Sequence, residues 1–134
     1  MKVDGRCHCG AIVFKAIVDP DKVEICHCSD CQTLSGTAFR VTVPARRKNF
    51  ELLQGALKTY VKVADSGVGR ALTFCPDCGA SIYSTAAGDE AADCYIRVGT
   101  LTQRRQLPPK IQYWTRSALA WLHVMADIPA VARQ

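Results

Sequence analysis

The sequence has no uninterrupted apolar run as long as the roughly 18 residues that a membrane-spanning helix requires. Its best apolar stretch, residues 11–18, is interrupted by Lys15. The first ten residues turn polar at once and contain no apolar segment of the kind found in secretory signals. We therefore expect neither a membrane span nor secretion, and we expect a cytoplasmic protein.

Repeats, low-complexity tracts and glycine-serine linkers are also missing, so no position marks a domain boundary. A length of 134 residues is about one domain's worth. The composition is 49% hydrophobic and 22% charged, which is enough apolar material for a buried core. These features predict a single domain that covers residues 1–134.

Long basic tracts are absent too, although the formal net charge is +5. Only the runs Arg46-Arg47-Lys48 and Arg104-Arg105 cluster, and both are shorter than a basic arm or an arginine-rich segment. The remaining basic residues are scattered, as on an ordinary solvated surface. We therefore expect no nucleic-acid partner.

Cysteine, in contrast, is abundant for so short a chain. The eight cysteines stand at Cys7, Cys9, Cys26, Cys28, Cys31, Cys75, Cys78 and Cys94. Eight cysteines would form a disulfide framework in a small secreted domain, whereas in a cytosolic chain they indicate metal or redox chemistry. The spacings C-x-C, C-x-C-x-x-C and C-x-x-C favour metal, because close pairs converge readily on one ion.

The rest of the chain is typical of many short strands with little helix. Segments rich in β-branched and aromatic residues, separated by turn signals, predict strands at 11–18, 39–43, 50–53, 57–63, 71–74, 80–84, 95–98 and 111–114. One helical turn is predicted to start at Ser29 as a possible N-cap, and another is predicted in 117–123. The fold class is therefore mainly β, with antiparallel sheets pinned by metal.

The local spacing of the cysteines indicates how they point. In an extended strand, Cys7 and Cys9 would face one way and His8 the other, and the same holds for residues 26–28 unless a tight turn intervenes. In residues 75–79, proline fixes the entry and glycine permits a left-handed exit, so two thiolates converge in a zinc knuckle.

Counting then suggests a pairing of these clusters. A structural zinc needs four sulfur or nitrogen ligands, and Cys7 and Cys9 together with Cys75 and Cys78 would supply them. The remaining set, Cys26, Cys28 and Cys31, offers three ligands with an open fourth position, which is typical of a catalytic zinc. The alternative is a closed second site whose fourth ligand is one of His8, His27, His123 or Cys94.

The motifs together resemble those of a known family. Closely similar residues are Cys-His-Cys-Gly at 7–10, Cys-His-Cys-Ser-Asp-Cys-Gln at 26–32, Gly-Thr-Ala-Phe at 36–39, Phe-Cys-Pro-Asp-Cys-Gly at 74–79, Arg-Val-Gly-Thr-Leu at 97–101 and Trp-Leu-His at 121–123. The chain resembles the glutathione-dependent formaldehyde-activating enzyme family, also called the centromere protein V family, over nearly its whole length.

This resemblance implies an Mss4-like fold of coiled β-sheets, a structural zinc on Cys7, Cys9, Cys75 and Cys78, and a catalytic zinc on Cys26, Cys28 and Cys31. It also implies a carbon–sulfur lyase that acts on a thiol–aldehyde adduct, as in S-(hydroxymethyl)glutathione synthesis, with glutathione as the thiol partner. Fold does not dictate function, so a non-enzymatic, zinc-stabilised module that binds protein or nucleic acid remains the alternative. Two zinc ions on seven thiolates would lower the formal charge by three, which further weakens the case for nucleic acid.

Other residues have two possible roles each. The carboxylates of glutathione would bind some of Arg46, Arg47, Lys48, Arg97, Arg104 and Arg105, unless these are only surface charges. Asp30 is either turn-forming or a proton acceptor, and His27 either relays a proton or donates to a backbone carbonyl.

Two further residues have an apolar sequence context. We expect His123 to be a satisfied core histidine and Cys94 to pack as a small hydrophobe. A reactive, low-pKa Cys94 would instead indicate a sulfoxide reductase.

Overall fold

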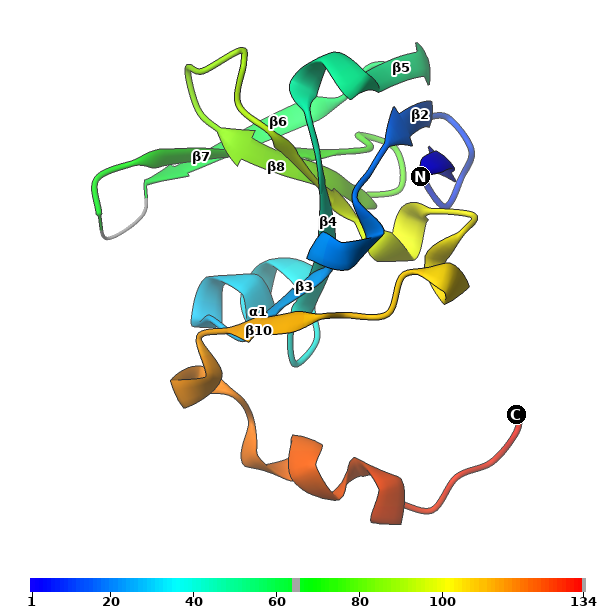
Figure 1. Cartoon of the computed structure of the whole chain (residues 1–134), viewed down its shortest axis with the longest axis vertical. Coiled ribbons are helices and arrows are strands. Elements are labelled where there is room, and N and C mark those ends of the chain that lie inside the picture. The colour runs from blue at the N-terminus through cyan, green and yellow to red at the C-terminus, as the bar shows by residue number, and fades with distance from the viewer. Residues whose placement is uncertain (64–65, 134) are drawn as a thin grey trace.

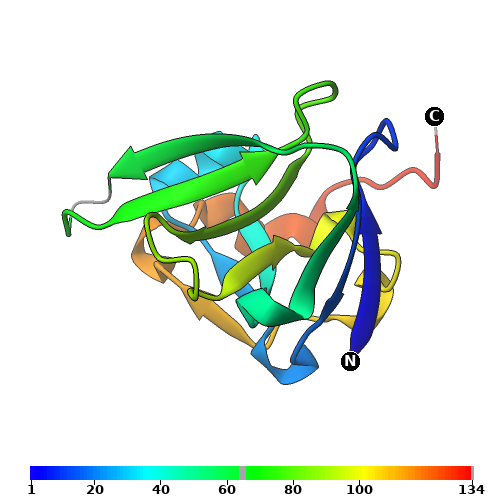
Figure 2. The same ribbon diagram turned by 90° about the horizontal axis from the view of Figure 1, so that it is seen from above.

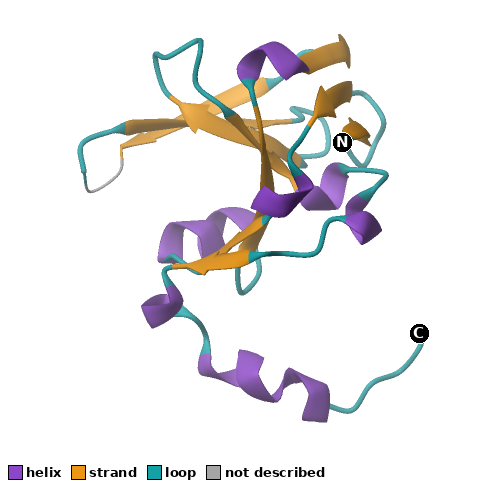
Figure 3. Ribbon diagram, in the orientation of Figure 1, coloured by secondary structure: helices purple, strands orange, loops and turns teal. Residues whose placement is uncertain are grey.

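A computed structural model describes residues 1–63 and 66–133. Its strands are β1 (Lys2–Arg6), β2 (Val13–Ile17), β3 (Glu24–Cys26), β4 (Arg40–Ala45), β5 (Phe50–Gln54), β6 (Lys58–Val63), β7 (Gly69–Phe74), β8 (Ser81–Ala86), β9 (Cys94–Arg97) and β10 (Ile111–Tyr113). The helix α1 spans Ser29–Ser35, and 3-10 helices span Pro20–Lys22, Arg47–Asn49, Val98–Thr100, Arg104–Gln106, Thr115–Ser117 and Ala120–Asp127. Strands and loops thus make up most of the described chain (Figure 3).

The strands form two sheets. The smaller sheet has the order β1-β2-β5, and the larger has the order β10-β3-β4-β9-β8-β7-β6. All pairings between the strands are antiparallel except that of β10 with β3, which is parallel. The β6–β7 hairpin extends away from the body, and the larger sheet curves, as Figures 1 and 2 show.

A single apolar core joins the two sheets. Phe14 of the small sheet stacks on Phe50 with ring centroids 5.2 Å apart, and Phe50 meets Tyr83 of the large sheet edge-on at 4.8 Å. Gly5 lies directly opposite Phe14, and a Cβ atom at this glycine would lie 2.1 Å from the Phe14 ring. The absence of a side chain at Gly5 therefore lets the Phe14 ring lie over β1.

The two faces of the large sheet differ in chemistry. Residues directly opposite each other on paired strands share a face, and so do residues two apart along one strand. One face carries the buried apolar side chains Val43, Ala45, Ile96 and Tyr83, which join the core. By the same register, the opposite face carries Glu24, Cys26, Arg40, Thr42, Arg97, Ser84, Leu72, Arg70 and Lys62. Alternation along the strands thus separates a core face from a polar face.

The prediction of a mainly β fold is confirmed. All eight expected strands are present, with ends displaced by at most two residues. Two further strands, β1 and β3, were not predicted, because β1 has one large apolar residue and β3 has only three residues. The helix begins at Ser29 as expected, but its N-cap is Cys28, so the prediction of Ser29 as the cap was wrong.

The turn of helix predicted at 117–123 is present in part, as the 3-10 helices Thr115–Ser117 and Ala120–Asp127 after β10. His123 is exposed there, so the prediction of a core histidine was wrong. Its apolar neighbours Trp121 and Val124 are about half exposed as well, because this segment lies outside the core cluster. Among the described residues, we find no helix with the length and apolar character needed to span a membrane.

Candidate functional site

Two turns of similar geometry bring four cysteines together. After β1, the N–H of Gly10 donates to the Cys7 carbonyl, and Gly10 has a φ of +84°. After β7, the N–H of Gly79 donates to the Cys75 carbonyl at 2.9 Å, and Gly79 has a φ of +74°. Glycine suits both positions because a left-handed conformation strains residues that have a Cβ atom. Each turn thereby directs a pair of cysteines toward the other turn.

The four sulfurs of Cys7, Cys9, Cys75 and Cys78 lie within 4.8 Å of one another. Cys9 Sγ is 3.5 Å from Cys7 Sγ and 3.7 Å from Cys75 Sγ. A tetrahedral zinc with Zn–S bonds of about 2.3 Å requires sulfurs roughly 3.8 Å apart. The donor set and its spacing therefore fit Zn²⁺, as the counting of cysteines predicts.

Backbone N–H groups support negative charge on two of these sulfurs. The N–H of Ile12 donates to Cys7 Sγ at 3.2 Å. The N–H groups of Cys9 and Ala80 donate to the Cys78 sulfur and lower the pKa of that thiol to about 6. A thiol with such a pKa is deprotonated at neutral pH, which is the form that binds a metal.

The second cluster forms where β3 leads into α1. The sulfurs of Cys26, Cys28 and Cys31 lie within 4.8 Å of one another, and in the described ranges no fourth cysteine, histidine or carboxylate belongs to this group. Cys28 Sγ accepts the N–H of Cys31 at 3.2 Å and so caps the helix. Burial raises the pKa of Cys28, but hydrogen bonds from the Cys31 thiol and N–H outweigh it, so that the pKa is lowered overall. Three convergent sulfurs fit a metal that keeps one position for another ligand.

His27 is buried between Cys26 and Cys28 in the sequence, but its ring does not join the group of sulfurs. Its Nε2 lies 2.7 Å from Gln112 Oε1, and because an amide oxygen only accepts, the ring N–H donates to it. The expected bond to a backbone carbonyl is therefore replaced by a bond to a side chain on β10. The N–H of His27 also donates to the Tyr113 carbonyl, and Gln32 Nε2 bridges the carbonyls of His27 and Ser117. The chain around β10 thus holds the second cluster in place.

A buried charged network supports Cys31. Arg40 Nε donates to Cys31 Sγ at 3.1 Å, and Arg40 Nη2 lies 3.3 Å from Glu24 Oε1. The hydroxyl of Thr42 accepts from Arg40 Nη1 at 2.6 Å and donates to Glu24 Oε1 at 3.2 Å. This network orients the guanidinium of Arg40 toward the three-cysteine cluster.

A cavity of about 150 Å³ opens against this cluster on the polar face of the large sheet. Its walls are Cys26, Cys28, Cys31, Leu34, Arg40, Lys62, Arg70, Leu72, Ser84, Arg97 and Trp114. A neighbouring hollow of about 600 Å³ shares Cys28, Lys62 and Trp114 with it and adds Arg116 and Ser117. The guanidinium of Arg116 lies 4.9 Å from the Trp114 ring. We call the two hollows the inner and the outer cavity.

The charges around the inner cavity are mostly positive. Lys62 pairs with Asp30. Asp30 lies in the first turn of α1, so of the two roles considered for it the turn-forming one does not apply. The guanidinium of Arg70 lies 5.4 Å from the Tyr95 ring. Burial, followed by the nearby charge of Arg40, lowers the pKa of Arg97 to about 10, which still leaves it charged at neutral pH.

Six basic residues were predicted from the sequence to bind the carboxylates of the substrate, and of these only Arg97 lines the two cavities. The residues that do not line them are Arg46, Arg47, Lys48, Arg104 and Arg105. Sequence reasoning missed Arg40, Lys62, Arg70 and Trp114 because they lie in separate strands or at the end of a strand. The alternation of side chains along the strands at 58–63 and 69–74 is the signal that places Lys62 and Arg70 on one face of the sheet. Only the register between strands shows that this face also carries the cysteines.

Cys94 packs as the sequence predicts. It is fully buried on the core face of the large sheet, and burial raises the pKa of its thiol. A sulfoxide reductase would need an exposed cysteine of low pKa, so these observations argue against that hypothesis.

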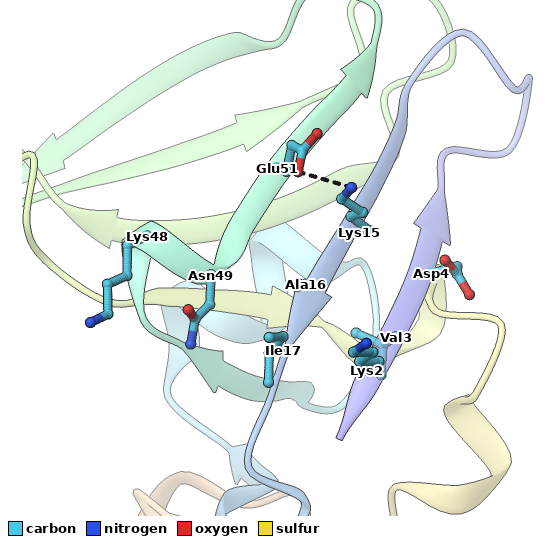
Figure 4. Close-up of a pocket in the computed structure, with 9 residues that line it drawn as sticks. All are labelled: Lys2, Val3, Asp4, Lys15, Ala16, Ile17, Lys48, Asn49 and Glu51. Carbon is cyan, nitrogen blue, oxygen red and sulfur yellow. Dashed lines mark ion pairs between the residues drawn. The ribbon is translucent and has the colours of Figure 1, made fainter.

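Another hollow, of about 370 Å³, lies over β1, β2 and β5 (Figure 4). Its side chains include the exposed ion pair Lys15–Glu51, whose charged atoms are 3.0 Å apart. No cysteine lines this hollow, and its charges are largely solvated. The three-cysteine cluster with its inner cavity is therefore the stronger candidate for chemistry.

The fold and these clusters define a mainly β protein with two cysteine groups able to hold metal, one of them beside a cationic cavity. A family model described as "Glutathione-dependent formaldehyde-activating enzyme" matches residues 2–117, which include both clusters. The protein belongs to the glutathione-dependent formaldehyde-activating enzyme family, as its motifs predict.

Two further proteins are similar to this chain. The uncharacterized lyase C29B12.13 of Schizosaccharomyces pombe is 28% identical over 80 residues, which are 60% of this chain and 55% of that protein. This chain therefore spans about half the length of that relative. A crystal structure of a Rhodobacter sphaeroides protein matches with a TM-score of 0.64 at 22% identity, covering 84% of this chain and 99% of that one. The second match supports the fold alone.

Proposed function

We propose that this protein is a zinc-dependent carbon–sulfur lyase that makes or cleaves a thiol–aldehyde adduct, with glutathione and formaldehyde as the expected pair. Cys7, Cys9, Cys75 and Cys78 would hold a structural zinc, and Cys26, Cys28 and Cys31 would hold a second zinc with one open position. One observation carries this proposal: the inner cavity lies against three convergent sulfurs, and among the described residues no fourth metal-binding side chain joins them. Zinc at this place would favour deprotonation of a thiol that reaches it.

The cavities suit a thiol that carries carboxylates. Lys62 and Arg116 border the outer cavity, and Lys62 also borders the inner one. Glutathione has two carboxylates, and charge-assisted hydrogen bonds from such cations would hold them while the sulfur enters the inner cavity. Trp114 stands between the cavities as an apolar wall. These residues would bind and orient the thiol.

The reaction needs no redox partner. In synthesis, the thiol sulfur forms a bond to the carbonyl carbon, the π electrons of the C=O bond move to the oxygen, and that oxygen takes up the proton that the thiol released. Cleavage is the reverse. Holding the two reactants together and orienting them is a large part of what such a site can contribute.

Exchange NMR on glutathione and ¹³C-labelled formaldehyde would test the activity, because it measures interconversion above the uncatalysed rate. We expect the zinc-loaded protein to speed up exchange, Cys28→Ser to lose that effect, and Cys94→Ala to keep it. Equal exchange rates with and without wild-type protein would refute the lyase.

Zinc K-edge absorption with and without glutathione tests the open position separately. We expect a new sulfur at about 2.3 Å in the presence of glutathione. An unchanged shell of four protein ligands on both ions would favour the alternative of a non-enzymatic binding module.

A further inference from the structure

Arg97 is the most buried charged side chain of the inner cavity. It is the last residue of β9, it is only 9% exposed, and it lies opposite Thr42 on the polar face of the large sheet. Its Nη1 atom is buried and has no hydrogen-bond partner among the described residues. A buried, unpartnered N–H on a charged group is costly, so its persistence in a cavity wall indicates that a ligand completes it.

The other cations of the cavity have partners. Arg40 contacts Glu24 and Cys31, Lys62 contacts Asp30, and the guanidinium of Arg70 lies over the Tyr95 ring. No ion pair in the described part of the chain includes Arg97. Arg97 is therefore the buried guanidinium of this cavity that suits an added hydrogen-bond acceptor carrying negative charge.

The place of Arg97 indicates which acceptor this is. Arg97 lines the inner cavity with the three cysteines but does not line the outer cavity. The inner cavity, at about 150 Å³, has room for a sulfur and a one-carbon group rather than for a whole tripeptide. A group that reaches Arg97 therefore lies close to the reacting sulfur, where the carboxylates of glutathione do not fit.

We infer that Arg97 is a catalytic residue whose guanidinium donates a hydrogen bond to the aldehyde-derived oxygen as that oxygen becomes negative. This inference rests on the proposed function. As the C–S bond forms, the electron pair of the C=O bond moves to the oxygen, and a fixed cationic donor there stabilises the charge. Arg97 gives up no proton, because the proton that neutralises the oxygen comes from the thiol. In cleavage, the same contact stabilises the alkoxide before the C–S bond breaks.

The test compares Arg97→Met with the exposed control Arg105→Met, using formaldehyde with either glutathione or 2-mercaptoethanol, which has no carboxylate. We expect Arg97→Met to lower kcat about 100-fold with both thiols, which is the usual loss for one oxyanion donor. The KM for each thiol and the dissociation constant of glutathione, measured by titration calorimetry without aldehyde, should stay within about twofold. Arg105→Met should match the wild type.

Other outcomes would overturn the inference. If Arg97→Met lowers kcat only with glutathione and also raises the dissociation constant of glutathione, Arg97 binds a carboxylate of the substrate instead. If Arg97→Met loses a zinc ion, Arg97 serves instead as a structural counter-charge to the cysteines. Should circular dichroism show that Arg97→Met does not fold, Arg97→Gln takes its place. Because glutamine has no positive charge, an unchanged kcat in this variant would refute the role. If the wild-type protein gives no turnover with either thiol, both the proposed function and the role of Arg97 are refuted. If the wild type is active and Arg97→Met is equally active, only the role of Arg97 is refuted.

Discussion

The Arg40–Glu24 pair allows a quantitative test of the network behind the second cluster. Its two side chains are 15% and 13% exposed, and their charged atoms lie 3.3 Å apart. Removing one partner of such a buried pair leaves the other charge desolvated, which costs about 3–5 kcal/mol. In Arg40→Met, Glu24 would keep only the hydroxyl of Thr42. We expect the free energy of unfolding to fall by about 3–5 kcal/mol.

Glu24→Gln should be milder, because Arg40 keeps its contacts with Thr42 and Cys31. We expect a loss of about 1–3 kcal/mol, the usual range for a hydrogen bond to a charged group. The double variant buries neither charge, so its loss should be smaller than the sum of the single losses by at least about 1 kcal/mol.

Urea unfolding at a fixed concentration of free zinc measures all these values, since bound metal adds to stability. The exposed pair Lys15–Glu51 is the control: its side chains are 53% and 60% exposed, and the coupling in Lys15→Met/Glu51→Gln should stay below about 1 kcal/mol. If the losses from Arg40→Met and Glu24→Gln simply add within about 0.5 kcal/mol, the pair is not coupled and the reasoning is wrong.

Three further predictions concern the core and the cysteines. Gly5→Ala should cost about 1–3 kcal/mol in urea unfolding, because the new Cβ would meet the Phe14 ring at 2.1 Å, and a wild-type midpoint would contradict this packing. Cys9→Ser should reduce the zinc content from two ions to one by elemental analysis and lower the melting temperature, whereas unchanged zinc would exclude Cys9 as a ligand. Cys94 should resist iodoacetamide in the native protein at pH 7–8, because its raised pKa keeps the thiol protonated and it is fully buried; mass spectrometry would detect labelling, which should appear only on unfolding.

Much of the fold and the cysteine clusters could be predicted from the sequence, and the cavity could not. Strand-forming residues and turn signals act locally, so eight strands were found near their observed ends. The cysteine turns are also local, because Gly79 permits the geometry that aims Cys75 and Cys78. The polar face depends instead on register among β4, β9, β8 and β7, which no local pattern fixes. His123 was misplaced because an apolar neighbourhood in sequence does not show whether the segment packs against the core.

The alternation of faces along β7 and β8 has a consequence for how this family can diversify. Leu72 and Ser84 line the inner cavity, while their immediate neighbours Thr73 and Tyr83 face the other way and are joined by a hydrogen bond. A substitution at Leu72 or Ser84 therefore changes the shape and polarity that a substrate meets without altering the residues that pack the interior. Selection for a new thiol or aldehyde can act on one set of positions while selection for foldability acts on the other, so descendants of one ancestor can differ in chemistry and keep the same scaffold.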